Sequence, residues 1–199
     1  MKFDLFYPVR PFTVIQPFGT NGEFYQKNGI NIKGHNGLDL LATHGQPIRA
    51  SHDGTAYPGV DAKEGYGVVV RTNEEFWYKD RWVYFKSIYW HLLSNIPVKM
   101  GQKVKAGDII GYADNTGFSF GDHLHFGLKP QYPGEGETVW WNYEDANGYL
   151  GAIDPTPYFN KYYGDQAQFV LATLTSILEL LKKVVFLLTK KNEFKAYLS

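Results

Sequence analysis

The sequence predicts a mostly β fold built on an antiparallel sheet, followed by a C-terminal amphipathic α-helix. Residues 12–160 are rich in Gly, Pro, Tyr, Val and Ile, and they break into short runs bounded by turn residues, which is typical of β structure. Residues 166–190 contain neither Gly nor Pro, and leucine dominates them, which predicts a helix. We therefore expect one domain over residues 1–160 and a helical extension over residues 165–199.

The expected strands are short runs separated by turn signals such as Asn36-Gly37, Pro58-Gly59 and Pro133-Gly134. They cover residues 49–50 continuing into 54–57, then 67–72, 82–89, 109–113 and 123–128. No helical pattern of about ten residues lies between them, so the pattern favours antiparallel strands over alternating strands and helices.

The expected C-terminal helix has its apolar residues in steps of three and four, which is a heptad pattern; they are Leu171, Leu174, Leu178, Leu181, Val185 and Leu188. Asp165 is placed to cap the start of this helix. Three roles remain open: packing on the β domain, self-association, or contact with a membrane surface. Glu179, Lys182 and Lys183 lie near the middle of the apolar stretch, which makes a membrane-spanning role costly and an interfacial one more plausible.

Composition excludes several classes of function. Lys plus Arg and Asp plus Glu number 20 each, so the chain has no overall basic character of the kind that marks nucleic-acid binding. There are no cysteines, so a transition-metal site has to use His and carboxylate ligands, which suit zinc. The first dozen residues contain no uninterrupted apolar run, and from them we expect no secretory signal.

Three local patterns contain groups suited to metal chemistry. His35 and Asp39 lie four residues apart around Asn36-Gly37, on what we expect to be extended chain. His123 and His125 alternate within an expected strand, so their side chains point the same way. His91 follows Tyr89-Trp90 in an aromatic, strand-like run. Each pattern has an ordinary interpretation alone: a surface pair, a half-buried polar strand face, and a hydrogen-bonded structural histidine. Together they supply enough groups for the three ligands of an open zinc centre, with two histidines left for proton transfer.

In this order the motifs resemble the lysostaphin/LytM-type family of zinc peptidases, whose signature is H-x-x-x-D followed far downstream by H-x-H. The Tyr89-Trp90-His91-Leu92 segment and residues 16–19, 104–111 and 116–119 also match in type, so the resemblance covers roughly residues 12–160. It implies an antiparallel sheet with a groove across it. It also implies that His35, Asp39 and His125 bind Zn²⁺ and that His91 and His123 form the catalytic pair.

The function implied by the resemblance is that of a zinc metalloendopeptidase acting on peptide cross-links or stem peptides of bacterial peptidoglycan. The alternatives are a catalytically inactive LytM-like regulator, a cell-wall-binding module, and a biotinyl- or lipoyl-type carrier suggested by residues 98–108. We expect action on the bacterial cell wall. The protein would be a phage-encoded lysin or virion enzyme, or would reach the wall by another extracellular route.

Two features fall outside the family pattern. His44 and His52 match no motif position, and we expect them to be ordinary loop or surface residues. Residues 73–86 and 131–151 form long loops, the second of which contains Trp140, Trp141, Tyr143 and Tyr149. Their aromatic side chains either build a binding groove or pack on each other.

Overall fold

The computed structural model describes residues 2–133, 145–160, 177–178 and 181–182. The chain divides into one unit of Met1–Phe159 and another of Asn160–Ser199. The helix expected over residues 165–199, with its cap at Asp165, lies outside the described residues except for four positions. That helix, its self-association or membrane contact, and the predicted domain boundary therefore stay predictions. Within the described part of the chain, no helix is long and apolar enough to cross a membrane.

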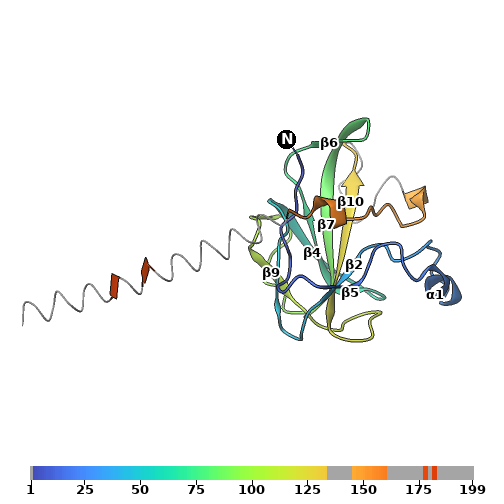
Figure 1. Ribbon diagram of the computed structural model, residues 1–199, viewed down its shortest axis with the longest axis horizontal. Helices are drawn as coiled ribbons and strands as arrows, with labels where there is room; N and C mark the ends of the chain where they lie inside the picture. Colours follow the sequence, from blue (N-terminus) through green and yellow to red (C-terminus); the bar gives the residue numbers. More distant parts are fainter. Residues whose placement is uncertain (1, 134–144, 161–176, 179–180, 183–199) are drawn as a thin grey trace, which may run out of the picture. The chain divides into compact units, whose positions relative to one another are not determined.

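The first unit is built on an eight-stranded sheet in which every pairing is antiparallel (Figure 1). The strands follow the order β1 (Val14–Gln16), β2 (Leu38–Leu41), β10 (His123–Gln131), β7 (Arg81–Leu92), β5 (Gly65–Arg71), β4 (Gly54–Asp61) and β8 (Gln102–Val104). A further strand, β6 (Phe76–Tyr78), pairs with β7 as a hairpin. Two more strands, β3 (Pro47–Arg49) and β9 (Ile109–Tyr112), form a separate antiparallel pair.

Helical structure in the first unit is sparse. The described residues of this unit contain one short helix, α1 (Gly22–Lys27), and two 3₁₀ turns, η1 (Asp145–Asn147) and η2 (Thr156–Tyr158). The prediction of a mostly β, antiparallel fold is confirmed, and four of the five expected runs overlap single strands. The first expected run is split, because residue 49 ends β3 and residues 54–57 begin β4.

Side-chain alternation separates a core face of the sheet from a polar face. Leu38 and Leu40 of β2, with Leu124 and Phe126 of β10, are fully buried in the main core. Phe3 and other residues of the N-terminal segment pack into the same core. Because successive strand residues point to opposite faces, Asp39, His123 and His125 project from the other side of the sheet. The core thus fixes two strands that carry polar side chains into solvent-accessible space.

His52 corrects one of the sequence predictions, because it is buried in the core and not on the surface. Its ring is 5% exposed and meets Phe3 edge-on at a centroid distance of 5.5 Å. Nε2 lies 2.8 Å from Ser87 Oγ, and Nδ1 lies 2.9 Å from the Asp53 carbonyl oxygen. The link between β3 and β4 folds back on the core, which no local sequence pattern signals. His44 is exposed, as expected.

Candidate metal centre

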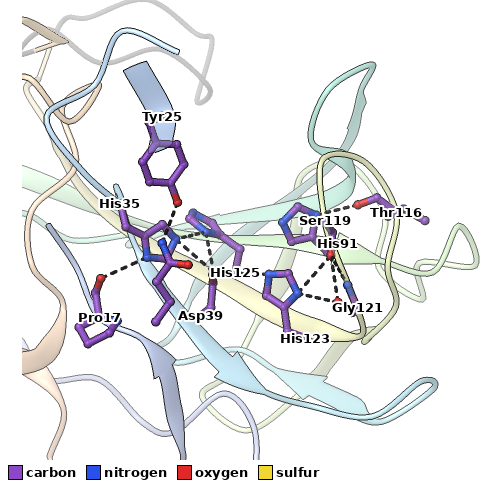
Figure 2. A network of polar contacts seen from close by, with 11 residues as sticks. Pro17, Tyr25, His35, Asp39, His91, Thr116, Ser119, Gly121, His123 and His125 are labelled. Atoms are coloured by element: carbon purple, nitrogen blue, oxygen red, sulfur yellow. Dashed lines mark hydrogen bonds and ion pairs between the residues drawn. The ribbon is translucent and has the colours of Figure 1, made fainter. Parts of the chain in front are cut away.

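Neighbouring strands bring the predicted ligands together. The antiparallel register of β2 and β10 places Asp39 directly opposite His125, so their side chains share the polar face. His35 lies in the loop before β2. Its backbone N–H donates to the Thr20 carbonyl at 2.7 Å, and its own carbonyl accepts from the Gly19 N–H at 2.8 Å. These two hydrogen bonds aim the imidazole at Asp39 (Figure 2).

Gly37 explains why the chain can pass so close to this site. A Cβ atom at this position would lie 2.6 Å from the Phe126 carbonyl oxygen and 2.8 Å from the His125 ring. Both distances are too short for any side chain. The Asn36-Gly37 turn signal therefore reflects close contact between the loop and β10 as well as turn geometry.

Three ligand atoms form a nearly equilateral triangle. His35 Nε2 lies 2.9 Å from His125 Nδ1, and Asp39 Oδ1 lies 3.1 Å from each of these nitrogens. Tetrahedral coordination with bonds of about 2.0–2.1 Å requires ligand atoms roughly 3.3 Å apart. Two imidazoles and one carboxylate at this spacing fit a Zn²⁺ ion with a fourth position left for water or substrate.

His123 and His91 lie beside this triangle. His123 Nε2 is 3.5 Å from Asp39 Oδ1, and the ring centroids of His91 and His123 are 4.7 Å apart. The structure thus brings all five predicted site residues into one cluster (Figure 2).

A β-bulge turns His91 towards the cluster. Trp90 pairs with His125 and shares its face, so regular alternation would turn His91 towards the core. Between the pairs Tyr66–Leu92 and Val68–Tyr89, however, β7 has one residue more than β5. His91 itself adopts a left-handed backbone conformation with φ of 63°. A bulge of this kind redirects a side chain, and here it places His91 on the same side as His123.

Backbone carbonyls orient both of these histidines. Nδ1 of His91 lies 2.7 Å from the Thr116 carbonyl oxygen, and Nδ1 of His123 lies 2.8 Å from that of Gly121. A carbonyl only accepts hydrogen bonds, so we assign the proton to Nδ1 in each neutral ring. Each Nε2 is then an acceptor facing the cluster. Ser119 Oγ, 3.2 Å from His123 Nδ1, gives further support.

Burial and hydrogen bonding shift the pKa values of three site residues. Burial favours a higher pKa for Asp39, but hydrogen bonds from His123, His125 and His35, donated when these rings are protonated, outweigh it and hold that pKa well below its usual range. Burial, with the His125 charge, lowers the pKa of His91 to about 4. Burial also favours a lower pKa for His123, but the hydrogen bond to Asp39 reverses the direction and raises it. Asp39 is therefore a permanent carboxylate, as a metal ligand has to be.

The cluster forms the floor of a cleft whose walls the sequence analysis did not identify. The lining includes Gln16, Tyr25, Glu64, Phe24, Phe118 and Phe120. The Tyr25 ring lies parallel to the His35 ring at 6.1 Å, and its hydroxyl accepts a hydrogen bond from Gln16 Nε2 at 2.9 Å. Tyr25 is carried by α1, a six-residue helix that is too short to produce a periodic signal.

A second group of possible ligands lies nearby. Single ligand atoms of His44, Asp114 and Asp122 all lie within 4.8 Å of one another, and His44 Nδ1 is 2.9 Å from Asp114 Oδ1. His44 and Asp122 are exposed, and exposed acidic groups of this kind are common without a metal.

The first expected long loop is corrected, because within residues 73–86 the structure has β6 and the start of β7, paired as a hairpin. The second, over residues 131–151, is described only in part. Trp77 and Trp82, on the β6–β7 hairpin, meet edge-on at 5.5 Å, yet each stays more than half exposed. Tyr149 packs against Phe18 at 4.7 Å. Both contacts agree with aromatic side chains packing on each other. Trp140, Trp141 and Tyr143 lie outside the described residues.

A groove with two imidazoles, one carboxylate and two further histidines is the arrangement of a metal-dependent hydrolase. Residues 33–139 match the family model of peptidase family M23, which is more than half of the chain, and the chain belongs to this family. The resemblance to lysostaphin/LytM-type peptidases is thereby confirmed. The carrier-domain alternative is set aside, since it belongs to a different class of protein.

Individual relatives agree with the family assignment. The chain is 38% identical over 98 residues to glycyl-glycine endopeptidase ALE-1 of Staphylococcus capitis, covering 49% of this chain and 25% of that protein. It is 36% identical over 98 residues to lysostaphin of Staphylococcus simulans, covering 49% and 18%. Its fold is similar to that of a zinc-containing peptidase from Vibrio cholerae, with a TM-score of 0.52, 28% identity, and 65% and 37% coverage. The chain thus spans a quarter or less of the length of these two sequence relatives.

Proposed function

We propose that this chain is a zinc-dependent endopeptidase that hydrolyses peptide bonds in bacterial peptidoglycan. The observation that carries the proposal is the triangle of His35 Nε2, Asp39 Oδ1 and His125 Nδ1, whose sides are 2.9–3.1 Å. Similarity to a glycyl-glycine endopeptidase, to lysostaphin and to a DD-carboxypeptidase/endopeptidase supports the choice of substrate.

His35, Asp39 and His125 would hold the metal, and their neighbours would keep them in position. His35 Nδ1 is 3.4 Å from the Pro17 carbonyl, which favours a proton on Nδ1 and leaves Nε2 free to act as a ligand. When bound, zinc would act as a Lewis acid that polarises a carbonyl group and lowers the pKa of water. The single negative charge of Asp39 would offset part of the metal charge at the point where a neutral peptide bond has to bind.

His91 and His123 would accept and donate the protons of the reaction. Each ring has its Nδ1 proton directed at a backbone carbonyl, so each Nε2 can accept a proton from an attacking water. The protonated ring could then donate to the departing amine and hydrogen-bond the developing oxyanion. The two rings lie 4.7 Å apart, centre to centre, so both can reach the same reacting centre from one side of a bound peptide bond.

Digestion of purified peptidoglycan tests this function. The zinc-loaded protein would be incubated with walls of several chemotypes, and released fragments would be analysed by mass spectrometry beside a His125→Ala variant. New amino termini from the wild type only would support the proposal and identify the bond. Intact walls of every chemotype, with zinc bound to the wild type, would favour the inactive-regulator or wall-binding alternative. The phage-borne role stays a prediction, tested by a search for the protein in purified virions.

A further inference from the structure

Three phenylalanines form one wall of the cleft beside the candidate metal centre. Phe24 comes from α1, while Phe118 and Phe120 come from the loop between β9 and β10. Their ring centroids lie 5.5–6.3 Å apart, so the three rings touch. They nevertheless remain 40%, 42% and 83% exposed. Apolar rings gathered at the edge of a cleft are characteristic of ligand binding, because their exposure to water is otherwise unfavourable.

The geometry of this phenylalanine wall favours a narrow apolar group. The Phe120 ring stands at 70° to the Phe24 ring and at 71° to the Phe118 ring. The three rings therefore form a corner, whereas stacking on a sugar calls for a flat platform. An extended alkyl chain can lie in such a corner and contact two ring surfaces at once.

Glu64 supplies a negative charge next to the same wall. The turn between β4 and β5 lies directly on the loop that carries Phe118: the Phe118 N–H donates to the Lys63 carbonyl, and a Cβ on Gly117 would lie 2.2 Å from the Glu64 carbonyl carbon. Glu64 lines the cleft, and among the described residues it makes no ion pair. The described lining residues include no Lys or Arg, and the other carboxylate, Asp39, is engaged by three histidines.

The surroundings of Tyr25 agree with this placement of Glu64. Burial, the Asp39 charge and, to a smaller degree, the Glu64 charge raise the pKa of Tyr25 to about 12. Glu64 and Tyr25 line the same cleft. A cation entering the cleft would meet this charge without displacing an existing partner.

We propose that Glu64 and the phenylalanine wall form a subsite for an amine-bearing side chain of the substrate peptide. The alkyl stem of a lysine-type or other diamino residue lies in the corner of the wall, and its ammonium group pairs with Glu64. The aromatic faces add a cation–π attraction to the same group. This inference rests on the proposed peptidase function and extends it, because a subsite of this kind distinguishes amine-bearing peptides from purely glycine ones.

The test uses peptides that differ by one side chain. Once wall digestion has identified the bond, acetylated and amidated peptides carry lysine, norleucine or glycine beside it, in one series before the bond and in another after it. Norleucine keeps the four-carbon stem and removes the charge. In one series we expect kcat/KM for the zinc-loaded full chain to be about three- to tenfold higher for lysine than for norleucine. Norleucine should in turn exceed glycine by at least about threefold.

Two variants separate the contributions. Glu64→Gln is expected to abolish the preference for lysine over norleucine while leaving norleucine ahead of glycine. Phe120→Ala, at a position that is 83% exposed, is expected to reduce the advantage of norleucine over glycine. Glu75→Gln, which changes an exposed carboxylate before β6, is the matched control and should keep both preferences. Added salt should weaken only the preference that depends on Glu64.

The outcomes distinguish this inference from the proposed function. If the wild type cleaves none of the peptides and no wall, the peptidase function fails. If it cleaves lysine and norleucine peptides equally in both series, or if Glu64→Gln keeps the preference, the subsite is wrong and the peptidase function stands. A Phe120→Ala variant that loses cleavage only of substrates carrying sugar would make the wall a sugar platform, and would also overturn the inference.

Discussion

At the scale of single residues, Asp39 is the group on which the candidate centre depends. One carboxylate oxygen lies within 3.5 Å of nitrogens from His35, His123 and His125. Its side chain is only 14% exposed, so water competes weakly for these contacts. The same atom would serve the metal and fix the positions of the histidines around it.

Asp39→Asn therefore separates charge from shape. The amide keeps the size of the carboxylate but is neutral, so we expect zinc affinity to fall at least about tenfold and activity to fall with it. Competition with a chromophoric chelator measures the affinity. Asp80→Asn, at the exposed β6–β7 turn, is the control for loss of a carboxylate elsewhere. Unchanged zinc affinity in Asp39→Asn would remove Asp39 from the ligand set.

His91→Gln should give the opposite combination of results. His91 is not part of the ligand triangle, so zinc content is expected to remain at the wild-type level. Loss of a proton-transfer group should lower kcat by about 10²-fold or more, with little change in KM. Metal analysis and steady-state kinetics on the same preparation check both statements. Loss of zinc from this variant would make His91 a ligand and would require a new assignment of the set.

The sequence predicted the five cluster residues better than it predicted what surrounds them. Two short motifs contain four of these residues, so residues that are close in the sequence are also close in the fold. They are His35 with Asp39, and His123 with His125. Glu64, Tyr25 and the three phenylalanines reach the cleft from separate segments, and only tertiary contacts unite them. The prediction that His52 is an ordinary loop or surface residue was wrong for the same reason. Its burial depends on Phe3 and Ser87, which are distant from it in the sequence.

At the scale of elements, the bulge in β7 controls where His91 points, and Gly67 on β5 makes room for it. A Cβ on Gly67 would lie 2.2 Å from the Trp90 ring and 2.7 Å from the Tyr89 carbonyl oxygen. Gly67→Ala should therefore push Trp90 and the adjoining His91 out of place. We expect a loss of about 1–3 kcal/mol in the free energy of unfolding and a fall in kcat.

Urea unfolding and kinetics of the Gly67→Ala protein measure these two effects. Adding Trp90→Leu removes the ring that clashes, so the double variant should be more stable than the sum of the two single changes predicts. Additive effects would mean that the glycine and the indole do not constrain each other.

The sheet could be predicted where its strands are long and where apolar and polar residues alternate clearly along them. Residues 82–89 and 123–128 fall inside β7 and β10, which carry the centre of the sheet. The strands β1, β6 and β8 have three residues each, and α1 has six, so none shows enough periodicity to be found. The bulge in β7 could not be predicted from the sequence either, because it depends on the pairing of β5 with β7.

At the scale of the whole molecule, the unit of Met1–Phe159 contains its own core and all of the described residues that line the cleft. A protein ending at residue 160 should accordingly keep its cleavage of soluble peptides and melt within a few degrees of the full chain. Calorimetry and peptide assays test this. A large drop in melting temperature would show that residues 161–199 pack on the β domain. A change of mass in sedimentation, with stability unchanged, would favour self-association through those residues.

The buried His52 should make the whole domain sensitive to acid. Burial lowers its pKa from 6.5 to about 4, so the folded protein keeps the ring neutral to about pH 4 while the unfolded chain takes up a proton near pH 6.5. Between these values the unfolded state binds more protons, and stability falls as the pH falls, by up to about 3 kcal/mol for this residue. The lowered pKa of His91 acts in the same direction in the metal-free protein.

Urea unfolding with chelator present, from pH 7 to pH 4, should therefore show a steeper loss of stability for the wild type than for His52→Gln. The variant is expected to be less stable at pH 7, because it disturbs the contacts with Ser87 and Asp53. The decisive quantity is the difference between the two curves, which should narrow as the pH falls; parallel curves would mean that His52 does not control acid unfolding.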